Sequence, residues 1–195
     1  MSGTTVAGGT PPTRTAIDVA TLLLVAGGLG LLLVRIWLPA LSAQGRVIGV
    51  GATMAAILAG SLLVPASAGR ATLRPALVLL IGFAAIVIAL LAGGAPVRSP
   101  VALWSLPLAV LAAIAEEALF RRAAYGALER HGAALAVGVT ALAFALIHVP
   151  LYGWAVLPVD LGAGLLLSWQ RWASGTWAVP ATTHAAANVL MTVLR

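Results

Sequence analysis

Long stretches without any charged residue dominate this sequence and limit what it can fold into. No ionisable side chain lies between Arg46 and Arg70, or between Arg74 and Arg98. A helix needs about 20 mostly apolar residues to cross the hydrocarbon core of a bilayer, and both intervals are long enough. Charged residues make up 8% of the chain, against about 25% in an ordinary soluble domain. The sequence therefore predicts an all-α fold, a polytopic transmembrane helix bundle.

The distances between charges and turn signals predict about seven membrane spans. The N-terminal segment 1–14 is rich in Gly, Thr and Pro and has no positive cluster before an apolar core. A cleaved signal peptide is therefore not expected, and the first apolar run should remain as a span. Turns are expected at the Gly- and Pro-rich segments 73–75, 93–100, 150–158 and 173–175. The expected spans cover approximately residues 17–40, 46–70, 74–98, 101–128, 132–148, 155–170 and 176–194.

The positive charge comes from arginines that are spread between the apolar runs. The chain has 11 basic residues, all of them Arg, and a formal net charge of +6. Because they form no block, we expect them to anchor loops at the lipid headgroups of the cell membrane, and we do not expect a nucleic acid partner. Arg35 lies near the end of the first expected span, where its long side chain should reach the headgroups.

The distribution of arginines over alternate loops predicts the orientation of the chain. Cytoplasmic loops carry an excess of Lys and Arg, and the larger set of arginines lies on the same side as the N-terminus. We therefore expect a cytoplasmic N-terminus. The larger set is Arg14, Arg70, Arg74, Arg121, Arg122, Arg130 and Arg171, and the smaller set is Arg46, Arg98 and Arg195.

Polar residues inside the expected spans gather after residue 100. An ionisable residue in a span costs several kcal/mol and marks a functional site by default. The spans of this region contain Glu116, Glu117, Arg121, Arg122, His148, Asp160, His184 and Asn188.

The first polar group is Glu116, Glu117 and Arg121, in the fourth expected span. Adjacent residues on a helix point about 100° apart, so the two carboxylates are not expected to have the same role. Glu117 and Arg121 are four residues apart, with the acid first, which favours an intrahelical pair. That pair would leave Glu116 facing elsewhere. The alternative is that all three charges lie at a helix end and are solvated.

Two further groups are Phe144 with His148, and His184 with Asn188. A lone histidine near an interface is more often structural, because a backbone carbonyl satisfies its imidazole. The spacing of four places His184 and Asn188 on one helix face, where they would serve either a reaction or a polar contact between helices. Three polar groups in three spans each need a partner, and a single shared pocket supplies it.

Together, the order Glu-Glu-x-x-x-Arg, Phe-x-x-x-His and His-x-x-x-Asn resembles the motifs of the CPBP family of intramembrane proteases. That family includes the type II CAAX prenyl proteases and the bacterial Abi proteins linked to bacteriocin processing or self-immunity. The segment 162–177 also resembles the family segment before the last motif, and the whole resemblance covers about residues 106–194. It suggests two parts: N-terminal helices of unassigned role in residues 1–98, and a protease core in residues 99–195.

The resemblance implies a glutamate-dependent intramembrane endopeptidase that cleaves a membrane-embedded or membrane-associated peptide or protein. Glu116 and His148 would hold and activate a water molecule. His184 and Asn188 would stabilise the oxyanion with their donors. Glu117 and Arg121 would be supporting residues.

Two other functions are compatible with the sequence. A non-proteolytic member of the same fold would be a membrane scaffold or an immunity protein. A small proton-coupled transporter would instead relay protons through Glu116, Glu117 and the histidines.

No cofactor is expected, and zinc at Glu116, His148 and His184 is the alternative. The absence of cysteine excludes a thiolate metal site and a cysteine nucleophile. Each zinc ligand would come from a different span, which gives no local preorganisation. A ligating imidazole also needs a carboxylate or carbonyl partner, and Glu117 is already matched to Arg121.

Overall fold

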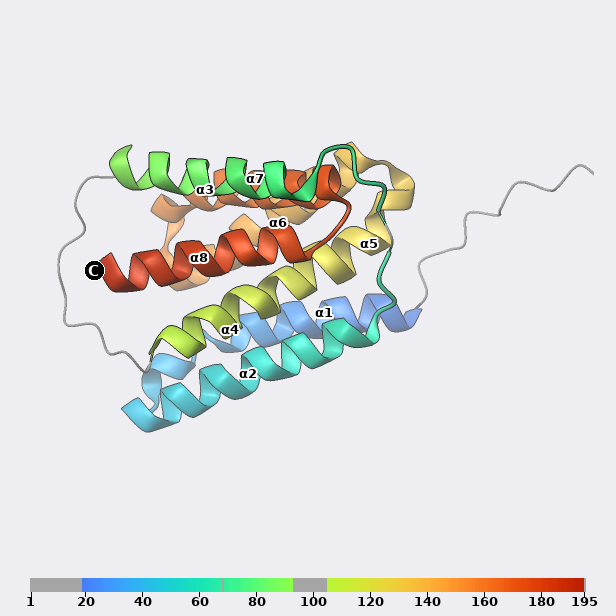
Figure 1. The fold of residues 1–195 in the computed structure, drawn as a ribbon. Helices are drawn as coiled ribbons and strands as arrows, with labels where there is room; N and C mark the ends of the chain where they lie inside the picture. The colour runs from blue at the N-terminus through green and yellow to red at the C-terminus, as the bar shows by residue number, and fades with distance from the viewer. Residues whose placement is uncertain (1–18, 68, 93–104, 195) are drawn as a thin grey trace, which may run out of the picture.

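The computed structural model describes residues 19–67, 69–92 and 105–194, and these form a bundle of helices (Figure 1). The all-α prediction is confirmed. The helices are α1 (Val19–Val34), α2 (Ala43–Leu63), α3 (Pro75–Ala92), α4 (Ser105–Glu117), α5 (Tyr125–Leu128), α6 (Ala133–Tyr152), α7 (Leu157–Ser174) and α8 (Ala178–Leu194). Short 3₁₀ turns cover Leu38–Ala40, Glu129–His131 and Trp154–Val156.

Helices occupy every segment that the sequence predicts as a span, within the described residues. Four of them are long and apolar enough to cross a membrane by length and composition: α1 with its following turn, α2, α3 and α6. α8 is a shorter apolar helix. The predicted start of the fourth span near residue 101 lies outside the described residues. With large apolar side chains exposed along α1, α2 and α3, the chain is a membrane protein.

The predicted turn at residues 150–158 is partly wrong. α6 continues through Pro150 and ends at Tyr152, and α7 begins at Leu157 with Pro158 in its first turn. Pro158 is well placed there, since the first N–H groups of a helix have no intrahelical partner. His148 consequently lies inside a continuous helix and not at its end.

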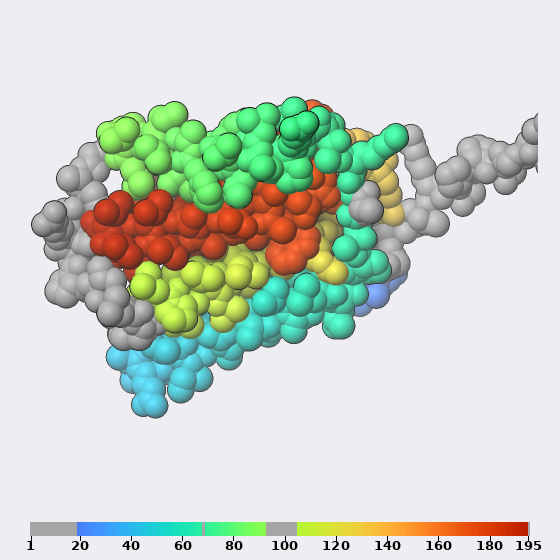
Figure 2. All heavy atoms as spheres, in the orientation of Figure 1, coloured from blue at the N-terminus to red at the C-terminus, as the bar shows by residue number. Residues whose placement is uncertain are grey.

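α4, the segment Ala118–Ala124 and α5 follow one another as one continuous rod. This rod lies at the centre of the bundle. α4 packs against α8 on one side and α2 on the other, while α3 contacts both α7 and α8. Figure 2 shows α3, α8, α4 and α2 side by side across one face. α7 packs most extensively on α6, and its Gly164 lies so close to α6 that an added Cβ would be 2.8 Å from the Ala141 carbonyl oxygen.

Two arginines tie the segment after α2 to the rest of the bundle. Arg122 donates from Nη1 to the Ser61 and Val64 carbonyls, at 2.8 and 2.7 Å. Arg171 donates from Nη2 to the Ser67 hydroxyl at 2.8 Å and from Nε to the Arg121 carbonyl at 3.1 Å.

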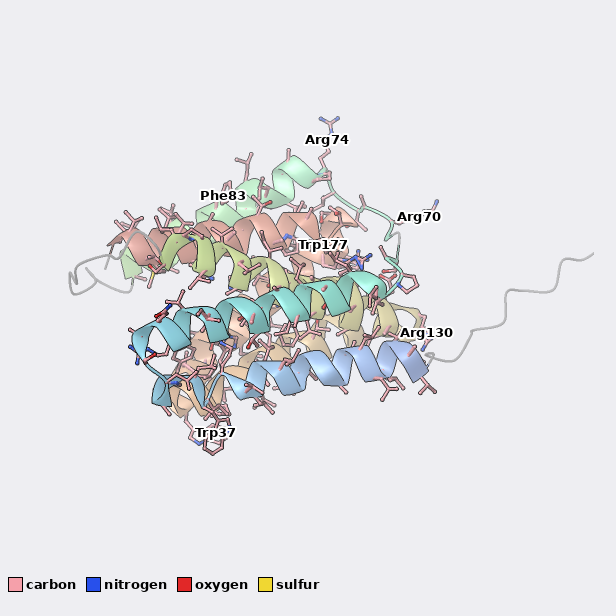
Figure 3. All side chains as sticks on the ribbon, turned by 90° about the horizontal axis from the view of Figure 1, so that it is seen from below. Trp37, Arg70, Arg74, Phe83, Arg130 and Trp177 are labelled. Atoms are coloured by element: carbon pink, nitrogen blue, oxygen red, sulfur yellow. The ribbon has the colours of Figure 1, made fainter. Side chains whose placement is uncertain are left out.

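The prediction that the arginines anchor loops at lipid headgroups is therefore wrong for some of them. Arg121 and Arg171 are buried and bond to protein atoms. Burial inside the bundle offers these guanidinium groups carbonyl and carboxylate acceptors, which are a good substitute for water and phosphate. Arg70, Arg74 and Arg130 lie toward the end where α2 finishes and α3 begins, opposite the exposed Trp37 (Figure 3).

Candidate functional site

The rod changes helix type at the acidic pair. α4 ends at Glu117, and Ala118–Ala124 continue as a π-helical segment, η2. Its i→i+5 bonding is seen from the Tyr125 N–H to the Phe120 carbonyl. π-Helical segments are rare and often mark functional sites. This one was not predicted from the sequence, and it begins directly after the two carboxylates.

Glu117 and Arg121 form the intrahelical pair that their spacing predicts. Arg121 Nη1 donates to Glu117 Oε1 at 3.0 Å, and both side chains are completely buried. Arg121 Nη2 donates to the Gly164 carbonyl on α7 at 3.0 Å. The alternative of three solvated charges at a helix end is thus wrong, because the packing of α7 covers this part of the rod.

Glu117 also accepts a hydrogen bond from the last motif. His184 Nδ1 on α8 lies 2.9 Å from Glu117 Oε1. A carboxylate oxygen accepts here, so Nδ1 carries the proton and the lone pair of a neutral imidazole is at Nε2. That Nε2 lies 4.0 Å from Glu116 Oε2.

Glu116 faces away from Glu117, as expected, and toward two other elements. Its Oε1 accepts a hydrogen bond from Arg35 Nη1 at 2.8 Å. Its Oε2 lies 3.8 Å from His148 Nε2 and 4.0 Å from His184 Nε2. The Glu116 side chain is 5% exposed. The carboxylate therefore has one oxygen on a guanidinium and the other between two imidazoles.

His148 is oriented by its own helix. Its Nδ1 donates to the Phe144 carbonyl at 2.7 Å, which leaves Nε2 toward Glu116. Asp160 on α7 approaches the same Nδ1, with Oδ2 at 3.9 Å. That Oδ2 is buried and makes no hydrogen bond among the described residues. The carbonyl contact that a structural histidine would make is thus present, and the other ring nitrogen still faces the carboxylate.

Phe144 forms the apolar wall that joins the three motifs. Its ring centroid is 4.7 Å from the Arg121 guanidinium carbon, 4.7 Å from the His148 ring and 5.7 Å from the His184 ring. It also meets Phe120 edge to face, with centroids 5.5 Å apart. These contacts explain why the second motif needs an aromatic residue four positions before its histidine: the ring orders groups from the other two motifs.

Asn188 makes no hydrogen bond, among the described residues, to the polar cluster of Glu116, His148 and His184. Its Nδ2 donates to the Ala109 carbonyl on α4 at 3.1 Å, about two turns before Glu116. This is the polar contact between helices that the sequence left open for the last motif. The structure thus brings Glu116, His148 and His184 together, and ties Asn188 to the helix that carries Glu116.

Arg35 and Asp160 contact the cluster, and the sequence did not assign either of them to it. Arg35 was expected at the headgroups, which is wrong: it bonds Glu116 from the turn after α1, and its side chain is only 16% exposed. Both are ionisable residues inside expected spans, and that was the signal for a functional role. Their partners lie far away in sequence, so only the packing of α1 and α7 reveals them.

The structure bears on the zinc alternative in two ways. Within the described ranges, no three or more His, Asp and Glu side chains form a group that could hold a metal ion. However, Glu117 is not reserved for Arg121, as the sequence suggests, because its Oε1 accepts from both Arg121 and His184. Both imidazoles thus have an acceptor at Nδ1 and turn Nε2 toward Glu116.

Comparison with known proteins agrees with the motifs. The family model "Type II CAAX prenyl endopeptidase Rce1-like" matches residues 98–190, just under half of the chain. That segment contains all three motifs, so the resemblance to the CPBP and CAAX proteases is confirmed. No curated protein and no solved structure matches the chain. The match supports the general class of a CAAX-type intramembrane endopeptidase.

The buried ion pair predicts that Glu117→Gln unfolds more easily than the wild type. Arg121 would lose its carboxylate in a completely buried site, at a cost of about 3–5 kcal/mol in the free energy of unfolding. Glu129→Gln is the control: its Oε2 is 3.4 Å from Arg171 Nη2 and the side chain is 26% exposed. It should lose less than about 1 kcal/mol. Thermal unfolding in detergent measures both, and equal losses would contradict the prediction.

Proposed function

We propose that this protein is a glutamate-dependent intramembrane endopeptidase of the CPBP type. It cleaves a membrane-associated peptide or protein by an activated water molecule. The observation that carries the proposal is the convergence of Glu116 Oε2 with two imidazole Nε2 atoms from α6 and α8, at 3.8 and 4.0 Å. The family match to residues 98–190 also supports the proposal, because it indicates a CAAX-type intramembrane endopeptidase in general.

The spacing between Glu116 and His148 suits a bridging water. Their facing atoms are 3.8 Å apart, which is too long for a direct hydrogen bond. Two hydrogen bonds of about 2.8 Å that meet at about 90° span about 4.0 Å, so one water fits between the two groups. Glu116 then takes the water proton while the oxygen bonds to the scissile carbonyl carbon. As the carbon–nitrogen bond breaks, the same carboxyl returns the proton to the leaving amine.

His184 and Asn188 are the proposed donors to the oxyanion. Glu117 fixes the His184 ring through Nδ1, so that Nε2 faces the same space as Glu116. Nε2 donates to the oxyanion when the ring is protonated. The Asn188 Nδ2 carries two N–H groups, and the Ala109 carbonyl accepts only one of them. The second N–H is the one proposed to act in the reaction.

An apolar groove of about 530 Å³ favours a substrate with an apolar segment. It lies on α4 and α8, the two helices that carry Glu116 and His184. Its lining offers small and branched apolar groups, and a substrate that is anchored in lipid supplies matching surface. The lining side chains are Ile114, Trp177, Ala178, Ala181, Thr182, Ala185, Ala186 and Val189.

The proposed location is the cell membrane, with a cytoplasmic N-terminus. Buried arginines do not report on loop position, so Arg121 and Arg171 are removed from the comparison of the two sides. The side of the N-terminus still has more arginines, which favours the same orientation. The remaining sets are Arg14, Arg70, Arg74, Arg122 and Arg130 against Arg46, Arg98 and Arg195.

The role of Glu116 predicts that Glu116→Gln abolishes cleavage and leaves the protein folded. The amide keeps the shape of the side chain but does not accept the proton from water. The measurement uses purified full-length protein in liposomes, with a farnesylated peptide that ends in a CAAX sequence and the same peptide without farnesyl. Wild-type protein should cleave at least one of them. An active Glu116→Gln would refute the mechanism, and proton flux through the wild type without cleavage would favour a transporter.

The proposed oxyanion contact predicts a loss of turnover in Asn188→Ala. Removal of one donor lowers kcat by about 10²–10³-fold and leaves KM nearly unchanged. Thr192→Ala is the control on the same helix, because among the described residues its hydroxyl donates only to the Asn188 carbonyl, at 2.7 Å. A lower Tm in Asn188→Ala with an unchanged kcat would instead assign Asn188 to the contact between α8 and α4.

We also propose that the reaction needs no metal ion. The support is the Arg35 guanidinium, which lies 2.8 Å from the carboxylate that a zinc ion would need. A cation so close opposes a second cation at the same group. We expect purified active protein to contain far less than one zinc per chain and to keep its activity in chelator. Stoichiometric zinc, with activity restored only by added metal, would contradict this.

A further inference from the structure

The N-terminal half of the chain contributes a side chain to the polar cluster. Arg35 lies 81 residues before Glu116 in sequence, yet its Nη1 is 2.8 Å from Glu116 Oε1. The family match begins at residue 98, so this arginine lies outside the part of the chain that the family describes. Arg35 is therefore a contact residue of Glu116 that does not belong to any of the three motifs.

The packing of α1 brings Arg35 to this position. Gly28, Leu32 and Arg35 lie on one face of α1 and its following turn, by the helical spacing of four and three residues. At Gly28 an added Cβ would be 2.6 Å from Leu119 of η2. Leu32 is 2% exposed and belongs to the core that includes Leu119 and Phe144. Arg35 is the next residue on this face, and its side chain bonds to Glu116 of the polar cluster.

The contact with Arg35 gives the two oxygens of the Glu116 carboxylate different partners. Oε1 bonds to Arg35, and Oε2 is the oxygen that faces the imidazole Nε2 atoms of His148 and His184. The carboxylate is planar, so a guanidinium on one oxygen restricts the rotation of the whole group. The side chains of Glu116 and Arg35 are only 5% and 16% exposed, which limits competition from water for this bond.

We propose that Arg35 is a positioning residue, which holds Glu116 by Oε1 so that Oε2 faces the proposed water between Glu116 and His148. The N-terminal helix α1 is then a required part of the reaction site. This inference rests on the proposed function for its catalytic meaning, and the pairing itself is testable without a substrate.

The first test measures the pairing by thermal unfolding of full-length protein in detergent. Arg35→Gln should lower Tm by about 4 °C or more in a chain of this size. In a Glu116→Gln background the same substitution should lower Tm by less than about half of that, because the partner charge is gone. Arg46→Gln is the control, since Arg46 is exposed and bonds the Leu41 carbonyl. Equal shifts in the two backgrounds would overturn the pairing.

The second test measures turnover of whichever of the two peptides the wild type cleaves. Arg35→Gln should lower kcat by about 10–100-fold, as expected for a misplaced catalytic group, with KM changed less than about threefold. Arg35→Lys should recover part of kcat, because the ammonium group keeps one charged donor. Arg46→Gln should match the wild type. A kcat that is unchanged or higher in Arg35→Gln would overturn the inference, and so would a change in KM alone.

The two tests separate the inference from the proposed function. If the wild type cleaves neither peptide, the proposed function fails, and the thermal cycle still decides whether Arg35 holds Glu116. If cleavage depends on Glu116 but the cycle shows no coupling and kcat is insensitive to Arg35, the function stands and the inference is wrong.

Discussion

A fully buried ion pair is the constraint on which the rest of this structure depends. Glu117 and Arg121 are both completely buried, and charges removed from water are stable only where neighbouring groups satisfy them. Arg121 obtains a carbonyl from Gly164 on α7 and an aromatic face from Phe144 on α6, while Glu117 obtains a hydrogen bond from α8. Three helices are thereby required at one point along the central rod, and the polar cluster forms where they meet.

The adjacent carboxylates have different environments because a helix turns between them. Glu117 is enclosed, and its Oε1 accepts from both Arg121 and His184. Glu116 is turned toward two imidazoles whose Nδ1 atoms are already occupied. This division suits a group that reacts and a group that supports it. The π-helical segment follows immediately, and its Arg121 carbonyl accepts from Arg171. The local irregularity is thus stabilised by the same α7 that covers the ion pair.

The two halves of the chain form one unit around the cluster. The family match covers residues 98–190. However, the turn after α1 supplies Arg35, and the end of α2 and the segment after it are bonded to Arg122 and Arg171. Ion pairs and hydrogen bonds of this kind are stable in an apolar environment because the alternative is an unsatisfied polar group. A division at residue 98 therefore describes sequence resemblance, and it does not describe where the polar cluster is built.

The sequence by itself determined the helical membrane fold, the pairing of Glu117 with Arg121 and the identity of the three motifs. These follow from apolar length, from a spacing of four residues and from local order, all of which are properties of neighbouring residues. Only the tertiary structure decided that α6 passes through Pro150, that Asn188 bonds α4, and that Arg35 and Asp160 reach the cluster. Those contacts depend on how helices pack across tens of residues, and hydropathy and spacing contain no information about which faces meet.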